Sequence, residues 1–127
     1  MAAYISKVLR GKNKPTYNKH IDNGDFVIVT NINKMKFTGK KLSNKIYYKH
    51  TGHPGGIKQT TPRILKDRNK TQDILRLAVQ RMLPGGPLAK KQLSKLKMYS
   101  GDQHPHDIQK PKEVNFSKLN LKNTRKS

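Results

Sequence analysis

The sequence predicts an α/β protein built in layers, with a mainly parallel sheet. Residues 26–29 form an unbroken run of β-branched and aromatic residues, which is typical of a strand covered on both faces. Residues 71–83 place apolar side chains at helical spacing, and strand and helix patterns interleave along the chain. With 127 residues, 32% of them hydrophobic, the chain supports one modest core and one domain.

The first element is predicted to be an amphipathic helix over residues 2–10, with Gly11 as its C-terminal cap. Ile5, Val8 and Leu9 share one face of this helix, and that face needs a sheet to pack against. No strand pattern precedes the helix. We therefore expect the first strand of the sheet to be missing from this chain.

Residues 12–20 are predicted to form an extended basic segment, because Pro15 disfavours helix. Tyr17 within it could stack on a base or a sugar, or could be buried beneath a solvated linker. Residues 22–25 have the composition of a turn, which leads into the strand at 26–29.

Polar and apolar residues alternate from 31 to 39, after which Lys40 and Lys41 mark an exposed turn. The next strand is predicted at residues 46–48, because Ile and Tyr favour extended backbone. This strand leads directly into a glycine-rich loop.

Three helices are predicted in the second half of the chain. Thr61 and Pro62 provide the cap and the first-turn proline of the first helix, and the second covers residues 71–83. Pro87 opens the third helix, which carries Leu88, Gln92, Leu93 and Leu96. A short strand at residues 98–99 follows this helix.

Periodicity ends after Asp102, where a Lys-rich and Asn-rich composition begins. We therefore predict an ordered domain over residues 1–108 and a basic tail over residues 109–127. The tail is expected to be extended, and disordered unless it is bound.

Two glycine-proline segments are the most informative local features. The first, residues 50–58, contains three glycines and one proline between Lys49 and Lys58, and the second is Pro84-Gly85-Gly86-Pro87. Glycine-rich backbone allows a partner to approach closely, and its amides can point at an anion. Both segments are flanked by cations, which makes them candidate contacts for a polyanion.

The charge of the chain indicates the same class of partner. Lys and Arg total 28 against 7 Asp and Glu, which gives a formal net charge of +21. Nucleic acid fits better than a membrane, because no long apolar run is present and the cations are spread along the chain. RNA fits better than duplex DNA, because there is no recognition-helix or finger motif while irregular loops are abundant.

Catalytic and metal-binding motifs are weak or missing. There is no cysteine, and the residues of the first glycine segment do not follow a nucleotide-binding fingerprint. The scattered acids suggest no catalytic grouping, so we expect no enzymatic role, no cofactor and no small-molecule substrate. Two histidine pairs could in principle meet around zinc, although phosphate or carbonyl contacts fit their spacing better.

An apolar set in the second half of the chain could bind a partner, but its helical spacing fits core packing better. The set consists of Met82, Leu83, Leu88, Leu93 and Leu96.

The residues around both glycine segments carry a resemblance to a known family. Residues 44–58, NKIYYKHTGHPGGIK, and residues 79–88, VQRMLPGGPL, resemble the bacterial-type thirteenth protein of the large ribosomal subunit. The similarity extends over roughly residues 2–110 and includes the LKMYSG stretch at 96–101. Relatives have a further N-terminal segment with a first strand, and they lack a Lys-rich extension like residues 116–127.

The resemblance implies a three-layer α/β/α fold with a central, mostly parallel sheet. It also implies binding to large-subunit ribosomal RNA beside neighbouring ribosomal proteins, and a role in early subunit assembly. It implies location in the ribosome of a bacterial cytoplasm or of an organelle. It also implies that residues 48–58 and 81–91 face RNA. Together with the charge, it gives these candidate RNA-binding residues: Arg10, Lys12, Lys14, Tyr17, Lys40, Lys41, Tyr48, Lys49, His50, Thr51, Gly52, His53, Gly55, Gly56, Lys58, Arg81, Gly85, Gly86, Lys90, Lys91, Lys95, His104 and His106.

Two other functions remain open from the sequence. A translational regulator that binds messenger RNA away from the ribosome would use the same basic surface. A small nucleotide-dependent enzyme on a doubly wound sheet would require a phosphate fingerprint that the chain lacks.

Overall fold

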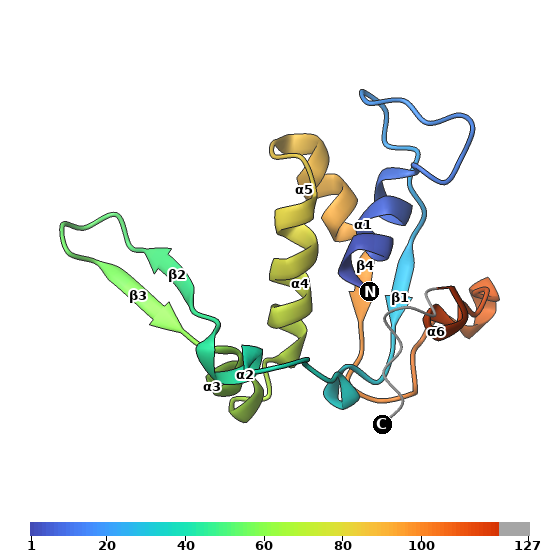
Figure 1. Ribbon diagram of the computed structural model, residues 1–127. Helices are drawn as coiled ribbons and strands as arrows, with labels where there is room; N and C mark the ends of the chain where they lie inside the picture. Colours follow the sequence, from blue (N-terminus) through green and yellow to red (C-terminus); the bar gives the residue numbers. More distant parts are fainter. Residues whose placement is uncertain (120–127) are drawn as a thin grey trace.

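A parallel pair of short strands lies beside a group of helices (Figure 1). The computed structural model describes residues 1–119. Strand β1 (Val27–Val29) pairs in parallel with β4 (Leu96–Met98), with Val27 opposite Leu96 and Val29 opposite Met98. The predicted α/β class and the parallel pairing are confirmed.

The strand at the predicted run 26–29 is less enclosed than its composition suggested. Phe26 lies just outside β1 and is 71% exposed, while the three strand residues are only half-buried. The expectation of a strand covered on both faces is therefore wrong within the described residues. Among these residues β1 has a single hydrogen-bonded neighbour, β4, so few side chains surround it.

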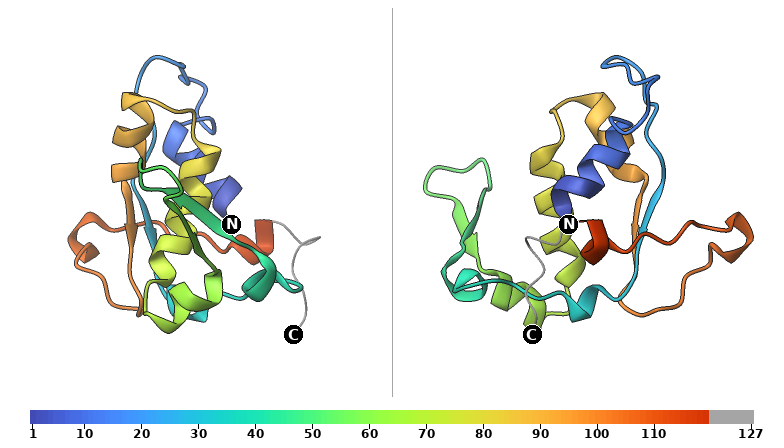
Figure 2. Two further views of the ribbon diagram at one scale, coloured as in Figure 1. Left: turned by 90° about the vertical axis from the view of Figure 1, so that its left-hand side faces the viewer. Right: turned by 45° about the vertical axis from the view of Figure 1, so that its right-hand side comes forward.

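Helix α1 (Ala2–Arg10) forms as its pattern predicts and packs against α4 (Thr71–Met82). Gly11 caps α1 in the left-handed region, at φ 76°, and its amide donates to the Val8 carbonyl at 3.0 Å. These helices lie beside the strand pair in Figure 2, and α1 contacts β1. The core between them is built from Ile5, Leu9, Ile32, Leu75, Val79, Leu83 and Leu96.

Helix α5 (Pro87–Ser94) begins at the predicted proline but ends earlier than its apolar spacing predicted. Leu96 is the first residue of β4, where it is 7% exposed and pairs with Val27. At Leu96, pairing with β1 therefore outweighs the tendency of the apolar spacing to continue the helix. The predicted strand near residues 98–99 corresponds to β4.

The middle of the chain contains short helical turns in place of the alternating segment predicted at 31–39. Asn31 adopts a left-handed backbone at φ 55°, which interrupts extended structure before the 3-10 turn η1 (Ile32–Lys34). Lys40 lies in the predicted turn, whereas Lys41 is already the first residue of α2 (Lys41–Asn44). Helix α3 (Pro62–Asp67) begins as predicted, with the Thr61 hydroxyl accepting from the Ile64 amide at 3.5 Å.

Strands β2 (Tyr47–His50) and β3 (Ile57–Thr60) form an antiparallel hairpin that projects from the body of the protein (Figure 1). The predicted strand at 46–48 is part of it, whereas β3 was not predicted. This hairpin, residues 47–60, is called the hairpin arm below. It is separate from the parallel pair, so the first glycine segment lies at the tip of a ribbon and not at the edge of the central sheet.

The C-terminal part of the described chain contains η2 (Asp107–Gln109) and the single helical turn α6 (Phe116–Leu119). The Phe116 ring lies 6.1 Å from the Tyr4 ring of α1. Residues 120–127 of the predicted tail lie outside the described residues. No helix within residues 1–119 is long and apolar enough to cross a bilayer.

Candidate nucleic-acid interface

The tip of the hairpin arm is a closed loop with internal hydrogen bonds. The Thr51 amide donates to the Gly56 carbonyl at 2.9 Å, and the Gly56 amide donates to the His53 carbonyl at 2.9 Å. The Gly52 amide donates to His50 Nδ1 at 2.9 Å, which fixes the orientation of that ring. The loop is therefore shaped before any partner arrives.

Glycine is required at two places in this loop for different reasons. Gly52 has φ 87°, a conformation that side chains with a Cβ rarely adopt. At Gly56 the obstacle is steric, because a Cβ would lie 2.0 Å from the Thr51 hydroxyl oxygen. A Cβ on Gly52 or Gly55 would meet nothing within 4 Å, so the outer side of the loop is open to a partner.

The hairpin arm carries positive charge without neighbouring acid. Residues 26–66 contain no Asp or Glu. Lys49 and Lys58 are exposed, and neither forms an ion pair within residues 1–119. The structure thus places Tyr48, Lys49, His50, Thr51, Gly52, His53, Gly55, Gly56 and Lys58 together on one projecting arm.

A buried tyrosine attaches this arm to the body, and the sequence analysis missed it. Tyr47 is 8% exposed, with Lys45 Nζ 5.3 Å and the Arg81 guanidinium carbon 5.5 Å from its ring centroid. Cations at this distance over an aromatic face are stabilising. Arg81, at the end of α4, therefore links the base of the hairpin arm to the second glycine segment. The sequence holds no clear signal for Tyr47, because the burial of β2 does not alternate and the neighbouring Tyr48 is exposed.

The Tyr47 phenol should ionise late. Burial raises its pKa above the usual 10.0, and the positive charge of Arg81 opposes this increase in part. Because the folded state favours the neutral phenol, the stability that this group contributes is complete below pH 10.0 and is lost as the pH rises through the folded pKa.

Tyr47→Phe should remove the last step from a pH titration of the protein in which phenolate absorbance is measured. An unchanged curve would contradict the burial of this ring.

The second glycine segment forms the turn between α4 and α5. Gly86 has φ 103° and precedes Pro87 at the start of α5. A Cβ on Gly85 or Gly86 would meet nothing within 4 Å, so this turn is also open on its outer side. The exposed cations on its two sides are Arg81, Lys90 and Lys91.

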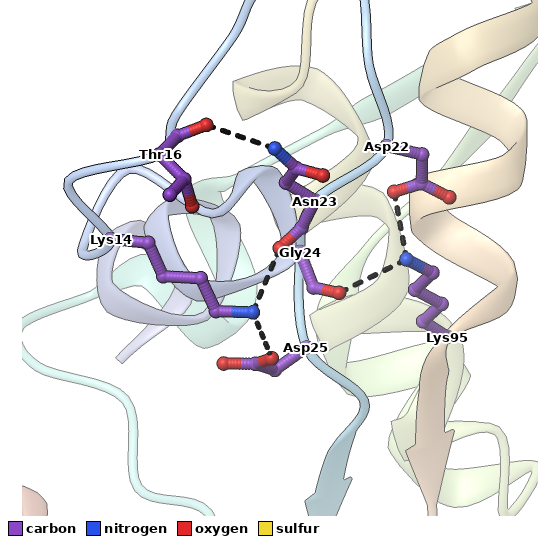
Figure 3. Close-up of polar contacts among 7 residues, drawn as sticks. All are labelled: Lys14, Thr16, Asp22, Asn23, Gly24, Asp25 and Lys95. Atoms are coloured by element: carbon purple, nitrogen blue, oxygen red, sulfur yellow. Dashed lines mark hydrogen bonds and ion pairs between the residues drawn. The ribbon is translucent and has the colours of Figure 1, made fainter.

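Two candidate cations hold the turn at residues 22–25 through ion pairs and hydrogen bonds (Figure 3). Lys14 Nζ lies 2.6 Å from an Asp25 carboxylate oxygen and also donates to the Asn23 carbonyl at 3.0 Å. Lys95 Nζ lies 2.8 Å from an Asp22 carboxylate oxygen and donates to the Gly24 carbonyl at 3.0 Å. Both lysines therefore have structural partners, unlike the cations of the hairpin arm.

The other predicted residues are spread over separate parts of the surface. Arg10 donates to the Tyr17 hydroxyl at 3.1 Å, so Tyr17 packs near α1 and is only partly exposed. Lys12 is exposed in the loop after α1. Lys40 and Lys41 are exposed at the start of α2. In Figure 1, α2 lies near the base of the hairpin arm, whereas α1 lies on the other side of α4.

His104 and His106 form a small cluster with Tyr99 after β4. The Tyr99 hydroxyl lies 2.7 Å from His106 Nε2, and the two histidine rings stack at 6.1 Å. His104 Nδ1 lies 3.7 Å from an Asp107 carboxylate oxygen. Within residues 1–119 no group of three or more His, Cys, Asp or Glu is arranged to hold a metal ion.

With this geometry established, comparison with known proteins identifies the family. The family model described as Ribosomal protein L13 matches residues 1–105. This chain belongs to the ribosomal protein L13 family. The match includes the hairpin arm, the second glycine segment and both paired strands of the ribosomal L13 fold seen here.

Individual relatives give the same assignment and carry the name large ribosomal subunit protein uL13. The protein from Neorickettsia sennetsu is 52% identical over 125 residues, which are 98% of this chain and 82% of the relative. The protein from Mesorhizobium japonicum is 49% identical over 97% of this chain and 80% of its own length. The protein from Thermosipho africanus is 53% identical over 91% of this chain and 77% of its own length. The resemblance noted in the sequence is therefore confirmed.

Proposed function

We propose that this ribosomal L13 chain is a structural component of the large ribosomal subunit that binds large-subunit ribosomal RNA in the bacterial cytoplasm. Its proposed partners are that RNA and neighbouring ribosomal proteins, and its proposed role includes early subunit assembly. No catalytic step and no cofactor are part of the proposal. The names of its bacterial relatives support the ribosomal location.

The unequal distribution of charge is the observation that carries RNA binding. Asp22 and Asp25 neutralise lysines of the body, and Asp102 accepts from the Asn31 amide group. The hairpin arm has no acid of its own, and its lysines remain available for phosphates. Cations without internal partners gain most from pairing with an external polyanion, because binding releases counterions from the RNA.

The affinity for RNA should fall steeply with salt. If about six phosphates are contacted, the logarithm of the association constant should fall with the logarithm of salt concentration at a slope of roughly −4 to −5. Filter binding or fluorescence anisotropy with a large-subunit RNA fragment measures this slope. A slope near zero would exclude a phosphate-dominated interface.

Sedimentation distinguishes the ribosomal component from a messenger-RNA regulator. The tagged protein should migrate with large subunits through a sucrose gradient and should remain there after a high-salt wash. A free pool that carries most of the protein would favour the regulator.

A further inference from the structure

The hairpin arm has two faces of different chemistry. Successive strand residues point to opposite sides, and residues paired across the two strands share a side. Lys49 is paired with Lys58, and these two therefore share one face. Tyr48 is paired with Gln59, and these two share the other.

The face that carries Tyr48 exposes one aromatic and one aliphatic side chain. Tyr48 is 59% exposed, and Ile57, its diagonal neighbour across the strands, is 60% exposed. A two-stranded ribbon with no packing on one face is only marginally stable by itself. A flat π surface would cover Tyr48 and Ile57 without requiring a deep pocket.

His50 adds a polar group to this same face, because it lies two residues after Tyr48 on β2. Its Nδ1 accepts from the Gly52 amide, so the neutral ring carries its proton on Nε2. Gln59 is also exposed there and offers both an amide donor and a carbonyl acceptor. Stacking and hydrogen bonding are therefore available side by side.

The opposite face carries a pair of like charges. Lys49 and Lys58 lie directly across from each other, an arrangement that destabilises an isolated hairpin. No acid is present from residue 26 to residue 66 to separate these charges. An external anion between the two ammonium groups would convert this repulsion into attraction.

We infer that the hairpin arm binds RNA through two separable contacts: an unpaired nucleobase stacked on Tyr48 and Ile57, and a backbone phosphate held by Lys49 and Lys58. This inference rests on the proposed RNA binding and specifies which RNA the arm selects. Inside a duplex the faces of the bases are already stacked, whereas an unpaired base offers its face to an aromatic side chain. The arm thus distinguishes single-stranded from paired RNA, while its lysines bind either form.

The test compares the affinity of the full chain for an oligoadenylate and for an adenylate–uridylate duplex of equal length. Tyr48→Ala should weaken binding to the single strand at least about fivefold, leave duplex binding unchanged and preserve the salt slope. Tyr48→Phe should retain the wild-type affinity, because it keeps the ring. Replacing both Lys49 and Lys58 by Gln should make the salt slope shallower by about 0.7 to 1.4 on the single strand, for one or two phosphates.

Phe26→Ala is the matched control, because Phe26 is also an exposed aromatic residue but lies outside the hairpin arm. It should leave both affinities unchanged. Retention of the late Tyr47 titration step in each variant shows that the arm is still attached. The fluorescence of an oligoadenylate that carries 2-aminopurine should be quenched when this base stacks on Tyr48. Tyr48→Ala should abolish the quenching.

The possible results separate this inference from the proposed function. If the wild-type chain shows no salt-dependent RNA binding, the proposed function fails. If the wild type binds with the expected slope but Tyr48→Ala is silent, or weakens duplex and single strand equally, only the base-stacking assignment is overturned. A silent Tyr48→Ala would leave a protein segment as the occupant of that face.

Discussion

Leu9→Ala is expected to lower the free energy of unfolding by about 2–5 kcal/mol. Leu9 is fully buried, in the core cluster where α1 meets α4 and β4. Truncation removes its apolar surface from the core and leaves a cavity within this cluster. Domains of this size have only about 5–15 kcal/mol of stability, so the variant should unfold at a much lower urea concentration. Urea titration followed by circular dichroism measures the change.

Ile108→Ala is the control for this prediction, because Ile108 is 94% exposed. It should change stability by no more than about 0.5 kcal/mol. Equal midpoints for Leu9→Ala and Ile108→Ala would show that the helices do not pack around Leu9 as described.

Gly24→Ala is expected to be at least as damaging, with a loss of about 3 kcal/mol or more. A Cβ at this position would lie 1.6 Å from the Leu9 carbonyl oxygen and 2.4 Å from its carbonyl carbon. Both are backbone atoms of α1, so the new methyl group can be accommodated only if the turn at 22–25 moves away from the helix. That movement would also break the hydrogen bond from the Asp25 amide to the Val8 carbonyl.

Gly101→Ala provides the comparison, because a Cβ there would meet nothing within 4 Å and the backbone is not in the left-handed region. Its thermal midpoint should equal that of the wild type. Gly24→Ala should lower the midpoint by roughly 10 °C or more. If the two alanine variants melted together, the close approach of the turn to α1 would be refuted.

Elements with a strong local signal could be predicted from the sequence. The helix at Thr71–Met82 follows from apolar spacing, and Gly11 ends the first helix because it can adopt positive φ. The start of α5 follows from Pro87, whose fixed φ suits the first helical turn. In each case the information lies within a few neighbouring residues.

Elements determined by distant partners could not be predicted in this way. Strand β3 has exposed side chains and no apolar alternation, so only its pairing with β2 makes it a strand. Leu96 fits a helical pattern, yet its pairing with Val27 places it in β4. Context decides both positions, because β3 gains the hydrogen bonds of its pairing with β2 and Leu96 gains burial beside Val27.

The same limit applies to the candidate interface. Net charge predicts a polyanion partner, but it does not separate cations with internal partners from cations without them. Lys14 and Lys95 look like Lys49 and Lys58 in the sequence, and only the positions of Asp22 and Asp25 distinguish the two pairs. RNA contact by the individual candidate residues stays a prediction until the variants are measured.

The parallel pairing of residues 27–29 with residues 96–98 implies an order of events during synthesis. The hairpin arm joins residues close in sequence, and such ribbons close within about 1–10 μs. The central strands must instead wait until almost the whole domain has been translated, and distant pairings of this kind slow folding. A nascent chain of this protein therefore contains both strands of the hairpin arm well before it contains both strands of the parallel pair.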